Sequence, residues 1–387
     1  MSNLMDTYKR LPVAFAKGEG AYLEDTEGKR YLDALSGIAV CGLGHAHPAV
    51  TRALAEQAAT LIHTSNLYQV PLQESLATKL CAQSGMDRVF FGNSGAEANE
   101  AAIKIARLYG HNRGIDVPTA VVMEGSFHGR TMGTLTATGS RKVQAGFEPL
   151  LKGFVRAPYG DAGAVAQIAQ NNPDVTAILV EPILGEGGIM IPDDGYLAAL
   201  RRICDEHEWL LMLDEVQTGN GRTGSLFAYQ QAGVMPDVVT TAKGLGNGMP
   251  IGACLARGKA AEVLKPGNHG STFGGNLLAC AAAHAVLDTL QADGLMERAV
   301  VLGERIKDGL AKALAGNNAV TAIRGKGLMI GVEMASPCAE LVQRGIDKGV
   351  LINVTRDSVV RLLPPLTLTD AEADELVARV ASTINDV

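Results

Sequence analysis

Short apolar runs alternate with stretches of helical periodicity between residues 88 and 256. The stretches 96–109 and 195–208 carry apolar residues at helical spacing, whereas the apolar runs are too short for helices. We interpret these runs as buried strands, at 88–91, 120–123, 177–181, 210–214, 238–241 and 251–256. Alternating strands and helices indicate a mainly parallel sheet with helices on both faces, because parallel strands need long crossover connections. We therefore expect an α/β fold.

The pattern changes after residue 276. A long Ala-rich helix and a second helix over 295–315 are predicted there, followed by short strands near 327–334 and 359–363. The last helix opens at Thr369 with Glu372 three residues later, which is a capping-box arrangement. These elements predict a second, smaller α+β domain.

The first 45 or so residues contain a predicted hairpin around Glu27 and Gly28 and are expected to join the smaller domain in space. No repeat, low-complexity tract or long Pro- or Ser-rich linker marks a boundary. We predict three segments: 1–48, which contributes to the small domain; 49–280, the large ligand-binding domain; and 281–387, the C-terminal small α+β domain.

The composition indicates a large core, since 47% of the 387 residues are hydrophobic and 19% are charged. The net charge of -7 argues against a broad nucleic-acid surface or polybasic membrane contact, because both need accumulated positive charge. No stretch reaches the ~18 uninterrupted apolar residues of a membrane span. The six cysteines form no C-x-x-C pair. We expect a cytoplasmic protein with reduced thiols.

The first candidate site is the run Gly92–Glu97, which follows an apolar strand and opens a helix. Free N–H groups at a helix start, the Ser94 hydroxyl and a glycine that permits close backbone approach together predict a phosphate cradle. The alternative is an ordinary helix capped by Ser94. No Lys-Ser or Lys-Thr follows, so the run is not a nucleotide P-loop.

The second candidate is Asp214, at the end of a buried strand and followed by Glu215. Ligands gather at the carboxyl ends of strands in such sheets, although Asp214 could instead cap a turn. The run 219–224 matches G-x-G-x-x-G, which keeps a nicotinamide-dependent dehydrogenase as a rival. That fingerprint needs its first glycine directly at the strand end, and DEVQT intervenes here.

The third candidate is Lys243, which lies among small and apolar residues just after a predicted strand. A lysine in such surroundings is expected to be partly buried, although most lysines are surface residues. Desolvation lowers the pKa of an amine, and a neutral amine can form a Schiff base with an aldehyde. A phosphate cradle, a strand-end carboxylate and a sheltered lysine are together the contacts that pyridoxal 5'-phosphate (PLP) requires.

With these features in place, the chain resembles the fold-type I, class III PLP-dependent aminotransferases, and most closely their acetylornithine aminotransferase branch. The similarity runs nearly end to end, through LDALSGIAVCGLGHAHP, FFGNSGAEANEAAIKIAR, SFHGRTMGTL, VEPILGEGG, LLMLDEVQTGNGRTG, AKGLGNGMPIGA, HGSTFGGN and VVRLLPPLTL. The resemblance implies a large PLP-binding domain and a smaller α+β domain. It also places the stretch with His45 and His47 in a family turn rather than a metal site, and no metal is expected.

The resemblance assigns the cofactor contacts to five places in this sequence. Lys243 would form the Schiff base and move the proton, and Asp214 would pair with the pyridinium nitrogen. Gln217 would bind the ring oxygen, and Phe127 would stack on the ring. Ser94–Ala96 would bind the phosphate.

The resemblance also assigns substrate contacts. Arg130 and Arg361 match two family arginines that bind carboxylates, and 2-oxoglutarate needs two such groups. Glu186 would cover Arg361 while a donor with one carboxylate is bound, and would release it for glutamate. Ser271 and Thr272 would reach the neighbouring subunit's site, Ser271 near the substrate and Thr272 at the phosphate, which implies a homodimer with shared active sites.

The expected reaction transfers the terminal amino group of N2-acetyl-L-ornithine to 2-oxoglutarate, giving N-acetylglutamate 5-semialdehyde and glutamate for arginine synthesis. Ornithine, N-succinyl-diaminopimelate and 4-aminobutyrate remain alternative donors, because the same residues would serve them all. A protein that binds the cofactor without turnover is the alternative from another class. Asn220, Met249 and Leu277 depart from common family residues, which leaves the fine substrate preference open.

Overall fold

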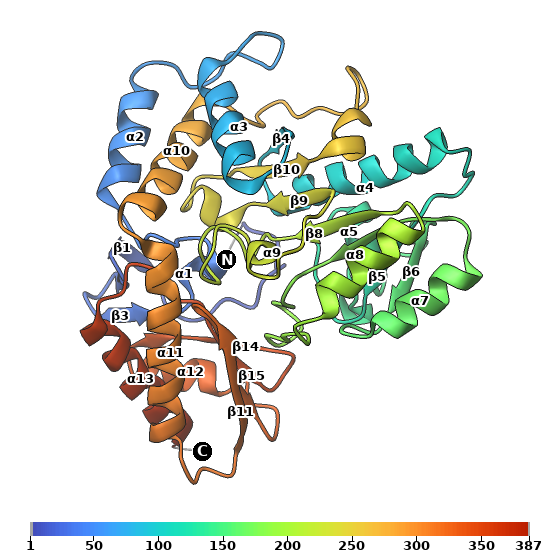
Figure 1. Ribbon diagram of the computed structural model, residues 1–387. Helices are drawn as coiled ribbons and strands as arrows, with labels where there is room; N and C mark the ends of the chain where they lie inside the picture. Colours follow the sequence, from blue (N-terminus) through green and yellow to red (C-terminus); the bar gives the residue numbers. More distant parts are fainter. Residues whose placement is uncertain (1–2, 386–387) are drawn as a thin grey trace.

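The computed structural model describes residues 3–385 and contains three β-sheets (Figure 1). The largest has seven strands in the order β4-β10-β9-β8-β7-β5-β6. Its strands are β4 (Arg88–Gly92), β5 (Thr119–Met123), β6 (Phe154–Ala157), β7 (Val175–Val180), β8 (Leu210–Asp214), β9 (Val238–Thr241) and β10 (Gly252–Ala256). The pairings from β6 to β9 are parallel, and β10 is antiparallel to both neighbours. The prediction of a mainly parallel sheet is confirmed.

Helices cover both faces of this sheet. Alternate strand residues face opposite sides, so Leu179 and Met212 pack with α4, while Ile178 and Leu211 pack with α7 and α8. The helices here are α3 (Pro71–Ser84), α4 (Gly95–Asn112), α5 (Met132–Ala137), α6 (Arg141–Gln144), α7 (Ala162–Asn171), α8 (Tyr196–Glu206) and α9 (Ala228–Gln231), with 3₁₀ turns η1 (Lys243–Leu245) and η2 (Gly258–Glu262).

The smaller sheets lie beside α11 and α13 in the lower part of Figure 1. One has the order β11-β12-β15-β14, and the other β1-β2-β3-β13. Their strands are β1 (Phe15–Glu19), β2 (Tyr22–Asp25), β3 (Arg30–Asp33), β11 (Val320–Lys326), β12 (Met329–Met334), β13 (Val350–Leu351), β14 (Asn353–Thr355) and β15 (Val359–Leu362). The remaining helices are α1 (Ser36–Ala39), α2 (Pro48–Ala58), α10 (Leu277–Ala292), α11 (Leu295–Ala313), α12 (Leu341–Asp347) and α13 (Asp370–Asn385).

Two local predictions are confirmed in this part of the chain. The antiparallel strands β2 and β3 flank Glu27 and Gly28, as the hairpin pattern predicts. At the start of α13, Glu372 N donates to Thr369 Oγ1 at 3.2 Å, and Thr369 N donates to Glu372 Oε2 at 2.8 Å. This reciprocal pair is the predicted capping box.

The N-terminal segment and the C-terminal part of the chain share one sheet and one core. β3 pairs in parallel with β13, and Leu32 packs with residues of α11 and α13. The predicted boundary after residue 280 falls inside the continuous helix α10 and needs correction. Helix α10 contributes Leu287 to the large-sheet core and Val286 to the small-domain core. The two cores are therefore joined by one helix rather than by a linker. A two-domain division, with α10 shared, remains our proposal.

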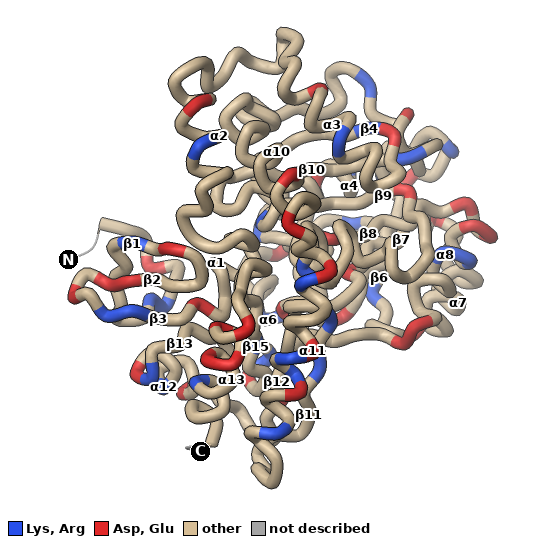
Figure 2. Tube along the Cα trace, turned by 60° about the vertical axis from the view of Figure 1, so that its left-hand side comes forward, with Lys and Arg blue, Asp and Glu red and all other residues tan. Residues whose placement is uncertain are grey.

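The charged residues of both signs are interspersed along the chain, as Figure 2 shows, in keeping with the modest net charge of -7. Within residues 3–385, no helix is both long and apolar enough to cross a membrane.

Candidate active site

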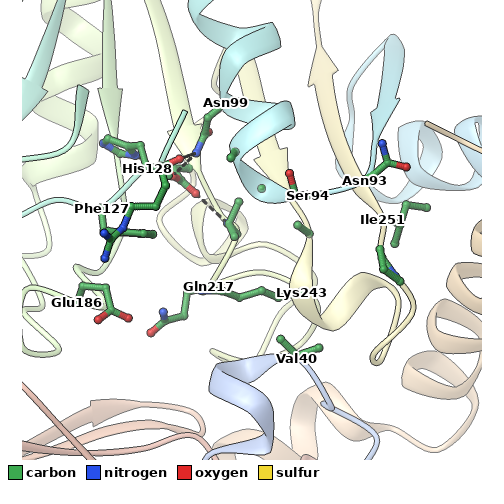
Figure 3. A pocket seen from close by; sticks show the side chains of 18 of the residues that line it. Val40, Asn93, Ser94, Asn99, Phe127, His128, Glu186, Gln217, Lys243 and Ile251 are labelled. Carbon is green, nitrogen blue, oxygen red and sulfur yellow. Dashed lines mark hydrogen bonds and ion pairs between the residues drawn. The ribbon is translucent and has the colours of Figure 1, made fainter. Parts of the chain in front are cut away.

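A cavity of about 400 Å³ lies where β8 ends and α4 begins (Figure 3). It brings together side chains that are far apart in the sequence. The predicted site residues that line it are Ser94, Gly95, Ala96, Phe127, Arg130, Glu186, Asp214, Gln217 and Lys243. In Figure 3, Phe127 and Glu186 lie on one side of the cavity and Asn93 on the other, with Gln217 and Lys243 between them.

Asp214 is a buried anion held in a fixed orientation. It is the last residue of β8 and is 3% exposed. Asn99 Nδ2 donates to Asp214 Oδ2 at 2.7 Å, and His128 Nδ1 lies 2.7 Å from the same oxygen. Val216 N donates to Oδ1 at 3.0 Å. These hydrogen bonds compensate the burial of the carboxylate and fix its orientation next to the cavity.

Lys243 opens the short turn η1 in a left-handed conformation, with φ 46°. Its side chain faces the cavity, so its exposure is intermediate, yet the surrounding protein desolvates the ammonium group. This burial lowers the pKa of Lys243, and Arg361 lowers it further, whereas Glu186 and Asp214 act in the opposite direction. The expectation of a sheltered lysine with a depressed pKa agrees with this geometry.

The N-terminus of α4 contributes backbone N–H groups to the cavity wall. Ser94 caps this helix, because its Oγ accepts from Glu97 N at 3.2 Å. Ser94, Gly95 and Ala96 also line the cavity, so capping and ligand binding are compatible here. A Cβ at Gly95 would lie 2.7 Å from Val216 Cγ1, which explains why this position requires glycine.

Glu181 fixes the segment that carries Phe127 and Arg130. It is 5% exposed, and its Oε1 accepts from Phe127 N at 2.8 Å. Burial raises the pKa of this carboxyl group above its usual range. The guanidinium of the exposed Arg130 lies 5.7 Å from the centre of the Phe127 ring. The aromatic ring and the exposed arginine are therefore both held at the cavity wall.

Arg361 lies behind the cavity and reaches it through Glu186 and Gln217. Its side chain is fully buried. Arg361 Nη1 donates to Glu186 Oε1 at 2.5 Å and to Gln217 Oε1 at 3.4 Å, while Nε donates to Asn353 Oδ1 at 3.2 Å. Within residues 3–385, Nη2 has no hydrogen-bond partner. A buried guanidinium with a free N–H pair is suited to a carboxylate.

Ser271 and Thr272 lie apart from this cavity. They line a second cavity with Leu67 and Phe91, and Ser271 Oγ accepts from Asn93 Nδ2 at 3.1 Å. Asn93 lines the first cavity, so this hydrogen bond links Ser271 to a residue of that cavity. The chain therefore does not bring Thr272 to its own Lys243.

The dinucleotide-site interpretation of the sequence fails on the geometry. The run 219–224 forms turns rather than opening a helix, and Arg222 within it is buried and donates to Leu328 O at 3.1 Å. This arrangement does not support a dinucleotide site. His45 pairs with Asp33 at 2.8 Å, which gives it a structural role.

Sequence reasoning missed the residues that support the predicted ones. Asn99 and His128 orient Asp214, and Thr240 Oγ1 in turn donates to Asn99 Oδ1 at 2.6 Å. Asn220 Nδ2 donates to the carbonyl of Ala242 at 3.0 Å, which fixes the backbone just before Lys243. The sequence signals were single polar residues, Asn99 in a helix, Thr240 in a strand, and His128 and Asn220 outside both. Their partners become apparent only in the fold.

The comparisons with known proteins show the family of this chain. The family model described as "Aminotransferase class-III" matches residues 5–384. Acetylornithine aminotransferase from Nitrosomonas europaea is 60% identical over 99% of this chain and 98% of that protein. Acetylornithine aminotransferase 1 from Bordetella pertussis is 52% identical over 97% of this chain and 96% of its own length. The chain belongs to the class-III aminotransferases.

Solved structures are similar over nearly the whole chain. An ornithine aminotransferase from Toxoplasma gondii, described with PLP at its active site, has a TM-score of 0.96 and 36% identity, covering 100% of this chain and 92% of that one. N-acetylornithine aminotransferase from Stenotrophomonas maltophilia has a TM-score of 0.86 and 36% identity, covering 98% and 97%. The protein is a PLP-dependent transaminase of fold-type I.

The residues of this structure fit PLP. Asp214 is a buried anion suited to a protonated ring nitrogen, and Lys243 is a desolvated amine in the same cavity. The cavity wall also contains a helix N-terminus with a glycine that has no room for a side chain.

Proposed function

We propose that the protein transfers the terminal amino group of N2-acetyl-L-ornithine to 2-oxoglutarate, giving N-acetylglutamate 5-semialdehyde and glutamate. Relatives named acetylornithine aminotransferase at 46–60% identity support this choice of donor. The observation that carries the proposal is the ion pair of 2.5 Å between Glu186 and the buried Arg361 beside Lys243. In this pair Glu186 neutralises the Arg361 cation, which would be free to bind a carboxylate once Glu186 moves away.

Bound PLP supplies an aldehyde for amines and an electron-withdrawing ring. Asp214 would hold the ring nitrogen protonated, and Gln217 would donate to the ring oxygen. Phe127 would stack on the ring face, while Ser94–Ala96 would bind the phosphate through backbone N–H groups and the hydroxyl. These assignments are supported by the fact that all of these residues line one cavity.

Lys243 would move the proton during the reaction. Its lowered pKa favours the neutral amine. A neutral amine can accept a proton from the substrate carbon that carries the amino group and deliver it to the cofactor. The surrounding protein partly desolvates this amine.

Arg130 and Arg361 would bind carboxylates. A donor such as N2-acetylornithine has one carboxylate, and Arg130 would bind it while Glu186 neutralises Arg361. Glutamate and 2-oxoglutarate have two carboxylates, so Glu186 would move away and Arg361 would bind the second. Covering Arg361 avoids leaving a buried cation unpaired.

Ornithine, N-succinyl-diaminopimelate and 4-aminobutyrate are the alternative donors, because each presents a terminal or distal amine to the same residues. Differences of about 1–3 kcal/mol in a few pocket contacts separate such substrates. The Toxoplasma gondii neighbour is named for ornithine, yet its 36% identity is lower than the 60% of the relative named for acetylornithine. Acetylornithine is therefore the preferred donor, and arginine synthesis the expected context.

We also propose a homodimer with shared sites. Thr272 of each subunit would reach the phosphate bound by the other, with Ser271 near its substrate. Large apolar side chains beside this segment support an interface, since Leu67 is 87% exposed and Phe273 60%. Light scattering after gel filtration tests the mass of the assembly.

Six free cysteines support the proposed cytoplasmic location.

The donor is tested by absorbance spectroscopy of the holoenzyme without keto acid. N2-acetylornithine is expected to bleach the bound cofactor at a lower concentration than ornithine, N-succinyl-diaminopimelate or 4-aminobutyrate. Lys243→Ala is the control and should show no turnover with any donor. A different donor acting best would replace the proposed substrate. Turnover by Lys243→Ala would contradict the proposed role of the lysine.

A further inference from the structure

The segment that carries Glu186 is a short loop between β7 and α8. We define the Glu186 loop as residues 184–190. Its two ends are bridged, because Leu184 and Met190 exchange backbone hydrogen bonds at 3.0 and 3.2 Å. These bonds close the loop on itself. Its position relative to Arg361 therefore depends on contacts with residues outside 184–190.

The large domain holds the loop through one carboxylate. Gly185 N donates to Glu181 Oε2 at 3.0 Å. Since Oε1 of the same side chain binds Phe127 N, Glu181 ties the loop to the segment proposed to stack on the cofactor. This contact fixes the start of the loop and leaves its far side to other residues.

The small domain holds the far side through Arg324 on β11. Arg324 Nη2 donates to Gly188 O at 2.6 Å, and Nε donates to Ile189 O at 2.8 Å. Its Nη1 pairs with Glu333 on the adjacent strand β12. Thr355 Oγ1 adds a bond of 2.5 Å to Glu186 O. A planar guanidinium is suited to binding two consecutive carbonyls while paired with a carboxylate.

The backbone at these carbonyls needs such support. Gly188 has φ 98° and Ile189 has φ 52°, and the second value is unusual for a β-branched residue. Strained conformations persist where the surroundings over-determine them. Ile189 is fully buried, and a Cβ at Gly331 on β12 would lie 3.1 Å from its Cβ. The small-domain sheet thus provides both the space and the hydrogen bonds for this turn.

We infer that Arg324 is a specificity-determining positioning residue. By holding the Glu186 loop against the small domain, it places Glu186 where it covers Arg361, and so favours amine donors with one carboxylate over glutamate. This inference rests on the proposed function, because it takes Glu186 as the group that covers Arg361. Arg324 does not line the cavity and acts through the loop.

The test compares two half-reactions of the holoenzyme by cofactor bleaching, one with N2-acetylornithine and one with glutamate. Arg324→Gln is expected to lower the second-order rate constant for acetylornithine about tenfold, and that for glutamate by less than about twofold. Hydrogen exchange of a peptide spanning 184–190 should become faster, which is a readout independent of turnover. Arg305→Gln is the matched control, since Arg305 pairs with Asp374 on the small-domain surface.

Two further variants separate this role from general destabilisation. Arg324→Lys keeps a cation but loses the fork, and is expected to shift the ratio of the two rate constants by about threefold. Glu186→Gln should shift the ratio as Arg324→Gln does, and the double variant should shift it no further, because both changes act on one contact.

Equal losses in both half-reactions, an unchanged ratio in Arg324→Lys, or additive effects in the double variant would overturn the inference. Unchanged exchange of the 184–190 peptide would do so as well. If wild-type protein reacts poorly with N2-acetylornithine, the proposed donor is wrong, and the comparison is made with the best donor that has one carboxylate. Failure of the inference about Arg324 and failure of the proposed donor are therefore distinguishable.

Discussion

At the scale of single residues, the site is a set of buried charges whose partners are fixed. Asp214 is held by Asn99 and His128, and Arg361 by Glu186. Removing one member of such a set leaves a buried group unpaired, which costs more than the hydrogen bond itself. Substitutions here are therefore expected to reduce activity more than their size indicates.

Asp214→Asn keeps the shape of the side chain and removes its charge. We expect kcat to fall by a factor on the order of 10²–10³, comparable to the loss of one preorganised electrostatic contact. Steady-state kinetics measure the effect, and Asp205→Asn on the exposed side of α8 should leave kcat unchanged. A kcat above about a tenth of the wild-type value would show that the charge is dispensable.

At the scale of elements, local sequence patterns predicted several helices and strands correctly, whereas no pattern predicted the long-range contacts between them. Strand periodicity predicted β8 and β9 at their observed bounds, and the Thr369 pattern predicted the start of α13. Strand β6 was missed because it is short and carries Arg156 at a sheet edge. The contacts of Arg324 with the Glu186 loop join residues more than 130 positions apart, and no local pattern encodes them.

Thr369→Ala removes the cap of α13. The free energy of unfolding is expected to fall by about 1 kcal/mol, because the N–H of Glu372 loses its acceptor. Urea denaturation measures this change. Thr51→Ala, at an exposed position of α2, should change stability by less than about 0.5 kcal/mol. An equal effect of both substitutions would argue against a stabilising capping box.

At the scale of the whole molecule, the cavity is lined mainly by residues of the large-sheet part of the chain, whereas Arg361 and two residues that hold the Glu186 loop, Arg324 and Thr355, lie on strands of a smaller sheet. The sequence predicted a large and a small domain and singled out Lys243, Asp214 and Ser94–Ala96, which line one cavity, since each is a local motif after a strand. It did not predict how α10 joins the two cores. Such sharing depends on packing that a linear pattern does not contain.

Global stability is expected to depend on pH through Glu215. This carboxyl group is fully buried and accepts from Ala228 N and Tyr229 N, and burial raises its pKa from 4.5 to about 7. The folded state therefore favours the protonated form, so this contribution is complete below pH 4.5 and is lost as the pH rises through 7. Urea denaturation at pH 5 and pH 8 should show a loss of stability in wild-type protein that is about 1–3 kcal/mol larger than in Glu215→Gln, where only other buried groups such as Glu181 contribute.

The exposed Glu56 on α2 offers a matched control. Glu56→Gln should keep the wild-type pH dependence. If Glu215→Gln keeps it too, the buried carboxyl group is not its source.

The central claim is tested most directly by following the nitrogen atom. The holoenzyme is incubated with 2-oxoglutarate and N2-acetylornithine labelled with ¹⁵N at the terminal amine, and the glutamate is analysed by mass spectrometry. We predict ¹⁵N-glutamate together with an equal amount of N-acetylglutamate 5-semialdehyde, and neither product with Lys243→Ala. Unlabelled glutamate, or no glutamate from the wild-type protein, would contradict the account.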